Sequence, residues 1–191
     1  MDKILFIIPP YVSFDSFVNP AINERIIPKK SGSYGAITTD MPIGVLSLSS
    51  YLKKHTDTET RLLDFNLVLN KIENFDYRSF SEMFHDLFLE KKWNSYAPDI
   101  IGISTLFTPS YYSMLNIAYV ARDIFSSALI IAGGGVPTNM YNEIFRDSTC
   151  IDALCYGEGE KPLLELVQAA EKKELLRTHN SWITREKAKG N

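Results

Sequence analysis

The sequence predicts an α/β domain in which helices cover both faces of a parallel five-stranded sheet. Short apolar runs alternate along the chain with longer segments whose apolar residues recur at helical spacing. The first run is apolar at every position from Ile4 to Ile8, as a central strand covered on both faces requires. A length of 191 residues suits one domain with one core. With right-handed crossovers, the expected strand order is 2-1-3-4-5, which is that of a flavodoxin-like (Rossmann-type) three-layer sandwich.

The first strand, expected at residues 3–9, ends at Pro9-Pro10 because proline cannot donate to a strand ladder. Residues 11–41 contain several prolines and glycines, and we expect a long irregular loop there, at the carboxyl end of the sheet. Such a loop is either a functional lid or a loose insertion, and both readings stay open. Pro42 suits the first turn of a helix over residues 43–54.

The middle of the chain predicts two strands and two helices. The strands are expected at residues 60–65 and 99–104, and Pro98 marks the entry to the second of them. The helices are expected at 77–92 and 110–125, because their apolar residues recur three and four positions apart. These residues are Phe80, Met83, Phe84, Leu87 and Phe88 in the first helix, and Met114, Ile117, Ala118, Ala121, Ile124 and Phe125 in the second.

The last part of the chain continues the alternation. We expect strands at residues 128–132 and 150–156, and helices at 139–146 and 161–173. A strand-like piece, Trp182-Ile183-Thr184, then precedes a polar end. We therefore expect the domain to cover residues 1–176 and a linker towards a further domain to start within 177–191.

Charge and cysteine content exclude several classes of protein. The formal net charge of −3 gives no electrostatic reason to expect nucleic acid or a membrane surface as partner. The apolar run at the N-terminus is too short for a membrane span or a signal sequence. Cys150 and Cys155 have no cysteine partner elsewhere, which excludes a disulfide framework and a four-cysteine metal site. We expect both to be reduced, core-side residues of a cytoplasmic protein.

Candidate ligand contacts follow two neighbouring strands. Ser104-Thr105-Leu106 and Thr108 follow the third strand, at the edge where ligands of such sheets bind. A helix cap by Thr108 or Ser110 would explain one of these hydroxyls, but not all of them. Gly133-Gly134-Gly135 follows the fourth strand and would let a ligand approach the backbone. A tight turn alone would need fewer glycines, so both loops favour ligand contact.

Other motifs point away from nucleotides, metals and catalytic side chains. Gly157-Glu158-Gly159-Glu160 resembles the start of a dinucleotide fingerprint, but it follows the last strand and Pro162 replaces the third glycine. Its acidic residues beside a helix N-terminus would repel phosphate. The three histidines, His55, His85 and His179, fall outside the strand ends. We therefore expect no metal ligand and no catalytic residue in this chain.

The spacing from Ser104-Thr105-Leu106 to Gly133-Gly134 resembles that of methionine synthase-type cobalamin-binding domains. In that family the serine hydrogen-bonds the dimethylbenzimidazole tail of the cofactor, and the glycines leave room for the tail beside the sheet. The resemblance assigns these roles to Ser104, Gly133 and Gly134. The family's cobalt-ligating histidine after strand one has no counterpart, because Pro10-Tyr11-Val12-Ser13-Phe14-Asp15 stands there.

Lacking that histidine, the chain is similar over nearly its whole length to the N-terminal cobalamin-binding domain of cobalamin-dependent radical SAM proteins. The motifs that carry this resemblance are Pro9-Pro10 before a long loop, Pro42-Ile43-Gly44, Leu62-Leu63-Asp64, and residues 99–104, 134–138 and 157–160. The resemblance implies a base-off cobalamin without a histidine ligand. The implied cofactor-binding residues are Pro10, Tyr11, Ser104, Thr105, Leu106, Thr108, Gly133, Gly134, Gly135, Val136, Pro137, Thr138, Gly157, Glu158 and Gly159.

The resemblance also implies a partner domain. The family's cysteine triplet C-x-x-x-C-x-x-C is absent, so the 4Fe-4S cluster and S-adenosylmethionine would belong to a radical SAM barrel outside this chain. In such enzymes cobalamin carries a methyl group from S-adenosylmethionine to an unactivated carbon or phosphorus. Tyr11 and the loop to Met41 would surround the lower cobalt face. The alternative is a vestigial, cofactor-free domain kept for interaction with the barrel; Ser104 and the glycine run favour cobalamin binding.

Overall fold

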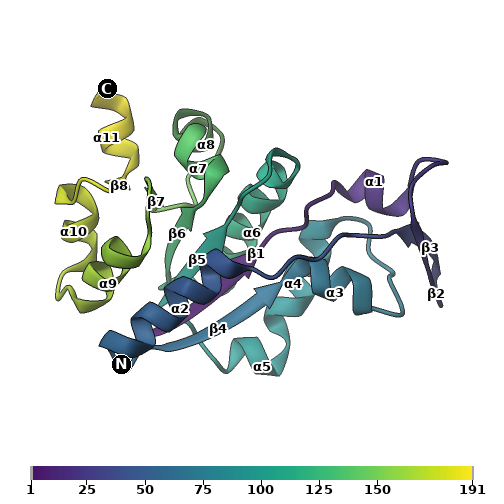
Figure 1. The fold of residues 1–191 in the computed structure, drawn as a ribbon, viewed down its shortest axis with the longest axis horizontal. Helices are drawn as coiled ribbons and strands as arrows, with labels where there is room; N and C mark the ends of the chain where they lie inside the picture. The colour runs from purple at the N-terminus through teal and green to yellow at the C-terminus, as the bar shows by residue number, and fades with distance from the viewer. Residues whose placement is uncertain (1, 191) are drawn as a thin grey trace.

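A computed structural model, which describes residues 2–190, contains a six-stranded sheet in the order β4-β1-β5-β6-β7-β8 (Figure 1). The first five of these strands are parallel and follow the predicted order, so the predicted fold class is confirmed. The sixth, β8, coincides with the expected strand-like piece at Trp182-Ile183-Thr184, but its antiparallel pairing with β7 was not predicted. The strands are β1 Lys3–Ile8, β4 Glu59–Asp64, β5 Ile100–Ser104, β6 Leu129–Gly133, β7 Ala153–Cys155 and β8 Trp182–Ile183.

Alternate residues of β1 enter two separate cores, which makes the fold three-layered. Ile4 and Phe6 face the core that contains α2 (Ile43–His55), α9 (Glu160–Gln168) and α10 (Lys172–Thr178). Leu5 and Ile7 face the larger core on the other side of the sheet. That core contains α3 (Phe65–Lys71), α4 (Phe80–Leu89), α5 (Lys91–Asn94), α6 (Tyr111–Ile124) and α8 (Tyr141–Asp147).

Several helices differ in extent or number from those predicted. Asp64 caps α3, a helix that was not predicted, by accepting a hydrogen bond from the backbone N–H of Asn66. Ser79 caps α4 in the same way, so this helix begins later than residue 77, and α5 follows separately. The helix predicted at 139–146 corresponds to α8, and a separate short helix that was not predicted, α7 (Gly135–Asn139), precedes it in the glycine loop. The segment predicted as 161–173 is divided into α9 and α10.

The segment expected to be an irregular loop, residues 11–41, contains α1 (Phe14–Val18) and a hairpin of β2 (Ile26–Lys29) and β3 (Gly32–Gly35). The hairpin lies at the far end of the molecule from the C-terminus (Figure 1). Phe17 stacks on Tyr34 with ring centroids 5.1 Å apart, and the Tyr34 hydroxyl donates to the carbonyl of Phe75 at 3.0 Å. These contacts join parts of the chain that are far apart in sequence, which a local pattern does not reveal.

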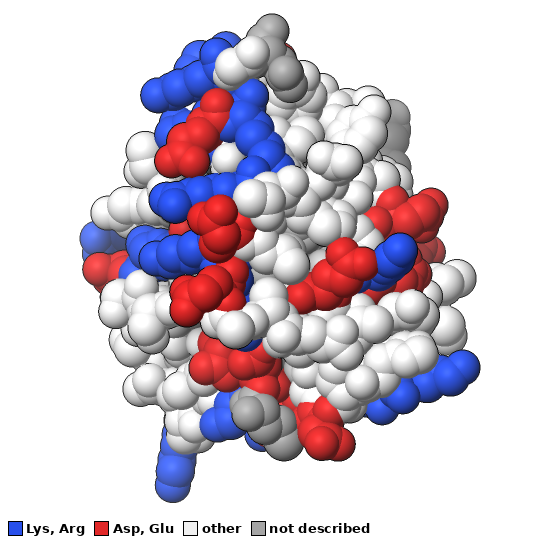
Figure 2. Space-filling model, turned by 90° about the vertical axis from the view of Figure 1, so that its left-hand side faces the viewer, with Lys and Arg blue, Asp and Glu red and all other residues white. Residues whose placement is uncertain are grey.

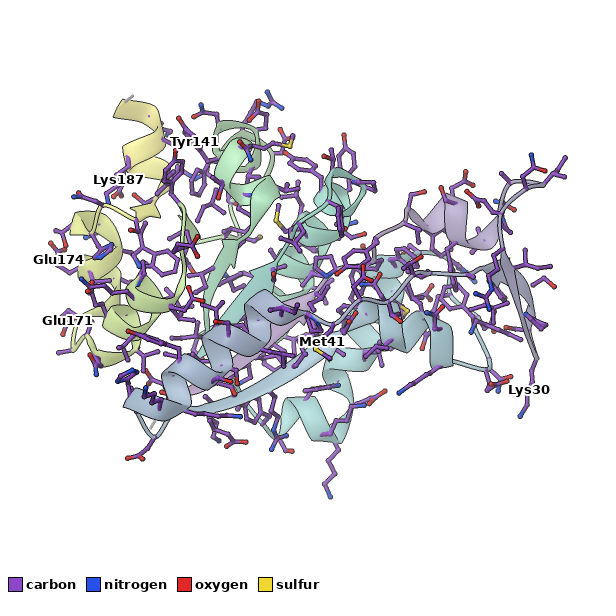
Figure 3. The ribbon with its side chains drawn as sticks, viewed as in Figure 1. Lys30, Met41, Tyr141, Glu171, Glu174 and Lys187 are labelled. Atoms are coloured by element: carbon purple, nitrogen blue, oxygen red, sulfur yellow. The ribbon has the colours of Figure 1, made fainter. Side chains whose placement is uncertain are left out.

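The C-terminal segment packs on the body, where a linker was expected. The Lys187 ammonium, on α11 (Arg185–Gly190), donates to the carbonyls of Leu176, His179 and Trp182 (Figure 3). On this side of the molecule basic and acidic side chains are interleaved (Figure 2). Residues 177–190 thus include the regular elements β8 and α11.

Two further findings concern membrane-spanning helices and the burial of the cysteines. Within residues 2–190, no helix combines the length and the apolar character that crossing a bilayer requires. Cys155 is buried, as expected, whereas Cys150 is only half-buried because it lies in the exposed approach to β7.

Candidate functional site

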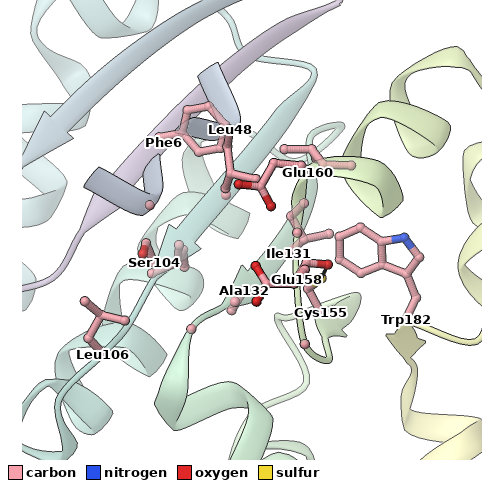
Figure 4. A pocket seen from close by; sticks show the side chains of 18 residues that line it. Phe6, Leu48, Ser104, Leu106, Ile131, Ala132, Cys155, Glu158, Glu160 and Trp182 are labelled. Atoms are coloured by element: carbon pink, nitrogen blue, oxygen red, sulfur yellow. Dashed lines mark hydrogen bonds between the residues drawn. The ribbon is translucent and has the colours of Figure 1, made fainter. Parts of the chain in front are cut away.

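The loops after β5, β6 and β7 meet at a cavity between the sheet, α2 and α9 (Figure 4). The cavity has a volume of about 230 Å³. Side chains of the α2-facing side of the strands form its floor, and the strand-end loops form its mouth. Its lining consists of Phe6, Gly44, Leu48, Gly102, Ile103, Ser104, Leu106, Ile131, Ala132, Gly133, Gly134, Cys155, Gly157, Glu158, Gly159, Glu160, Leu163 and Trp182.

The structure brings about half of the predicted site residues to this cavity. Those that line it are Ser104, Leu106, Gly133, Gly134, Gly157, Glu158 and Gly159. The other predicted residues do not line it: Pro10, Tyr11, Thr105, Thr108, Gly135, Val136, Pro137 and Thr138. Among these, Pro10, Thr105, Val136 and Pro137 are buried in the fold, whereas Thr108 and Gly135 are exposed.

Ser104-Thr105-Leu106 and the glycine run form one backbone unit. The N–H of Thr105 donates to the carbonyl of Gly133 at 2.9 Å, and the N–H of Val136 donates to the carbonyl of Thr105 at 3.1 Å. Gly134 has a φ of +104°, and a Cβ added to it would lie 2.6 Å from the Thr105 carbonyl oxygen. The fold itself therefore requires glycine at 134, before any ligand is considered.

Other glycines leave open space in the wall of the cavity. A Cβ added to Gly44 or Gly157 would meet nothing within 4 Å, and one added to Gly133 would only touch the Cβ of Cys155 at 3.6 Å. Since Gly44 lies on α2, where any good helix former would serve, its missing side chain widens the cavity without a demand from the backbone. These positions form a cradle that side chains would otherwise fill.

The polar groups of the cavity are few. The Ser104 side chain is half-buried, and its hydroxyl makes no hydrogen bond with another of the described residues. Glu160 Oε1 accepts a hydrogen bond from the Ser47 hydroxyl at 2.7 Å, which ties α9 to α2. Burial, together with Glu160 and Glu158, raises the pKa of the Cys155 thiol to about 11, so this wall residue is a neutral thiol at neutral pH.

The arrangement suits the binding of a flat, mostly apolar group with one or two hydrogen-bonding atoms. No cluster of three or more histidine, cysteine, aspartate or glutamate side chains with metal-binding geometry occurs among the residues that the structure describes. The side chains of the cavity can hold and orient a ligand.

Tyr11 lies beside the loop after β5. Its ring meets that of Phe107 edge-to-face, with centroids 5.0 Å apart, and its N–H donates to the amide oxygen of Asn66 at 2.8 Å. Burial, with smaller effects of Asp64 and Asp40, raises the pKa of the Tyr11 phenol, so it is neutral at neutral pH. Tyr11 therefore presents an aromatic, uncharged surface near the strand ends.

The helix-cap alternative does not hold for the side chain of Ser110. Its hydroxyl donates to the carbonyl of Pro10 at 2.7 Å, and neither it nor Thr108 caps α6 through its side chain. A 3₁₀ turn at Thr108–Ser110 leads into α6 instead. The hydroxyl of Ser110 thus joins the end of β1 to the loop after β5.

Sequence reasoning missed the cavity residues that lie outside strand-end loops. Gly44 and Leu48 come from α2, Leu163 from α9 and Trp182 from β8. The alternation of residues along β1 could have indicated which strand residues face α2, but it does not reveal which of these residues border an open cavity. In the sequence, Gly44 belongs to the helix-opening motif Pro42-Ile43-Gly44, which does not indicate a cavity.

Comparison with known proteins agrees with this geometry. The profile of the family described as "B12 binding domain" matches residues 38–167. An uncharacterized methyltransferase of Pyrococcus horikoshii is 27% identical over 175 residues, which cover 89% of this chain and 30% of the relative. Anaerobic magnesium-protoporphyrin IX monomethyl ester cyclases match over shorter stretches. The Rubrivivax gelatinosus protein is 29% identical over 48% of this chain and 16% of its own length.

The second cyclase, from Cereibacter sphaeroides, is 35% identical over 44% of this chain and 13% of its own length. The chain thus spans less than a third of the length of each of these relatives.

Proposed function

Because the chain belongs to the B12-binding domain family, we propose that it holds cobalamin with the nucleotide tail of the cofactor in the cavity between α2, α9 and the sheet. The observation that carries this proposal is the cradle at the strand ends, where Gly44 and Gly133 leave space that side chains would fill. The family match, residues 38–167, includes both glycines.

The residues present fit such a tail. Its aromatic base would lie against apolar walls such as Leu48 and Leu163, and the Ser104 hydroxyl is available to donate to a ring nitrogen of the base. Cys155 adds an uncharged thiol to the same wall. The apolar walls suit a neutral aromatic base, whereas the carboxylates of Glu158 and Glu160 lie in the lining contributed by the loop after β7 and the start of α9.

We further propose that the cofactor is bound base-off and without a histidine ligand. When bound, cobalamin supplies a cobalt centre that carries a methyl group. No histidine lines the cavity: His55 ends α2, His85 lies beside Asp86 on α4, and His179 pairs with Glu165 at 2.8 Å. Tyr11, with its neutral phenol and its contact to Phe107, is our candidate for the lower cobalt face.

In the whole protein, we propose, this module serves a radical SAM enzyme that transfers a methyl group from S-adenosylmethionine through cobalamin. The iron–sulfur cluster and S-adenosylmethionine would be held by a partner barrel. Two findings support a multidomain enzyme: the chain covers at most 30% of its relatives, and these are named as a methyltransferase and as cyclases.

The test is retention of cobalamin by the purified 191-residue chain. The protein is mixed with hydroxocobalamin, freed of unbound cofactor and examined by visible absorption and circular dichroism. The proposal expects roughly one cofactor per folded chain, with the spectrum of the base-off form. Folded protein without cofactor would contradict it and would favour the vestigial, cofactor-free domain. Retained cofactor with a base-on spectrum would contradict the base-off assignment alone.

A further inference from the structure

Trp182 forms one end of the cavity and comes from outside the segment that matches the family profile. It lies on β8, beyond residue 167, and is only 1% exposed. In Figure 4 the six-membered ring of its indole is the part nearest to Cys155 and Ile131, and its nitrogen lies on the far side. The cavity therefore ends on the edge of an aromatic ring.

The backbone holds this indole in a fixed place. Trp182 is opposite Cys155 in the β7–β8 pairing, and the N–H of Tyr156 donates to the carbonyl of Ser181 at 2.8 Å. The Trp182 carbonyl accepts a hydrogen bond from the Lys187 ammonium at 2.8 Å. A ring held from both flanks loses little conformational entropy when a ligand packs against it.

The turn before β8 is also held. The N–H of Ser181 donates to Nδ1 of His179 at 3.1 Å, so the other ring nitrogen, Nε2, carries the proton in the neutral imidazole and lies 2.8 Å from Glu165. Glu165 belongs to α9, the helix that covers the cavity. The position of Trp182 is thereby coupled to the cavity wall.

The indole nitrogen has no hydrogen-bond partner among the described residues, although it is buried. A buried tryptophan N–H usually finds a partner, and its absence costs free energy. An aliphatic residue would fill the same core without this cost. What Trp182 offers to the cavity is therefore the edge of its aromatic ring and not a hydrogen bond from its nitrogen.

We infer that Trp182 recognises the aromatic base of the nucleotide tail, by ring contact at the closed end of the cavity. This inference rests on the proposed function. It makes Trp182 a specificity-determining residue: the ring favours a flat aromatic base and limits how far the base enters. Because the corrin ring is too large for this cavity, a corrinoid without the tail does not meet Trp182.

The first test compares two ligands on the full chain: cyanocobalamin and dicyanocobinamide, which lacks the nucleotide. Trp182→Phe keeps an apolar ring, but the smaller side chain does not extend as far into the cavity. We expect this variant to bind cyanocobalamin about three- to tenfold more weakly and dicyanocobinamide as the wild type does. Trp93→Phe is the matched control: Trp93 is buried on α5, in the other core, and its replacement should leave both affinities unchanged.

A second measurement does not depend on the folding of the Trp182 variant. The chain has two tryptophans, so ¹⁵N-labelled Trp93→Phe protein shows one indole N–H resonance, that of Trp182. We expect cyanocobalamin to shift this resonance and dicyanocobinamide to leave it in place. An unmoved resonance with cyanocobalamin bound, or an equal loss of affinity for both ligands in Trp182→Phe, overturns the inference and leaves the proposed function standing. If the wild type binds no cobalamin, both fail.

Discussion

The carbonyl oxygen of Thr105 lies 2.6 Å from the point that a Cβ on Gly134 would occupy. The same carbonyl accepts a hydrogen bond from Val136, so the strand end and the glycine turn form a single backbone unit. From the sequence alone, the spacing between Ser104-Thr105-Leu106 and Gly133-Gly134 indicated ligand contact. The backbone contact of Gly134 with Thr105 gives this spacing a structural reason as well. Gly134 serves the fold first, and the neighbouring glycines leave the space.

Gly134→Ala should therefore destabilise the fold. Alanine at a φ of +104°, against a backbone oxygen, is strained, and we expect a loss of about 1–3 kcal/mol in the free energy of unfolding. Gly133→Ala, whose added methyl makes an ordinary 3.6 Å contact, should change it by less than about 0.5 kcal/mol. Urea unfolding followed by circular dichroism measures both, and equal stabilities of the two variants would contradict the assignment.

The main sheet was predictable because β1, β5 and β6 are compact apolar runs between helical segments, and the edge strand β4 ends in the apolar pair Leu62-Leu63. The strand-like character of β8 was predictable but its place in the sheet was not, since that place is set by pairing with Leu154 and Cys155. The hairpin in residues 26–35 was missed for a related reason: Phe17, Tyr34 and Phe75 stabilise it from separate parts of the chain.

The site was predicted at its strand ends and missed elsewhere. A parallel sheet brings the residues after β5, β6 and β7 to one edge, so Ser104, Gly133 and Gly157 could be placed from sequence. Gly44 and Trp182 border the same cavity from elements 138 positions apart, which only tertiary packing brings together. Thr105 and Val136 were predicted to contact a ligand, but they are buried and contact each other through the backbone. A sequence pattern does not distinguish such a loop residue from one that lines a cavity.

Ser104→Ala tests the hydrogen bond to the base. Because this half-buried hydroxyl has no hydrogen-bond partner among the described residues, its removal should leave the free energy of unfolding nearly unchanged. Loss of one ligand hydrogen bond should weaken cobalamin binding about two- to tenfold, and cobinamide binding should not change. Titration by isothermal calorimetry separates the two ligands, and equal weakening for both would place Ser104 against the corrin rather than the tail.

Asn66 anchors the chain where β1 ends. Its side chain is fully buried, accepts from the N–H of Tyr11 and donates to the carbonyl of Pro9 and to Asp64. Asn66→Ala leaves these groups without their partner, and we expect a loss of about 1–3 kcal/mol in the free energy of unfolding. Asn70→Ala, on the same helix but partly exposed, is the comparison; a smaller loss at Asn66 than at Asn70 would speak against this anchor.

The raised pKa of Cys155 predicts a pH dependence. The folded thiol titrates at about 11 instead of 9.0, so its contribution to stability is complete below pH 9.0 and is lost as the pH rises through 11. Over that window the wild type should lose stability relative to Cys155→Val, because the variant has no thiol to ionise. At about pH 8 a thiol reagent should modify half-buried Cys150 well before Cys155. Equal rates would contradict the buried, neutral thiol.

The most direct test of the cofactor's place is Gly44→Leu. A side chain at this position extends into the cavity and meets nothing within 4 Å at its Cβ, so the fold should be as stable as the wild type or slightly more stable. Ser50→Leu, exposed on the same helix, is the control. Equilibrium dialysis against cyanocobalamin should show binding by the wild type and Ser50→Leu and at least tenfold weaker binding by Gly44→Leu. Unchanged binding by folded Gly44→Leu would place the tail elsewhere and contradict the account.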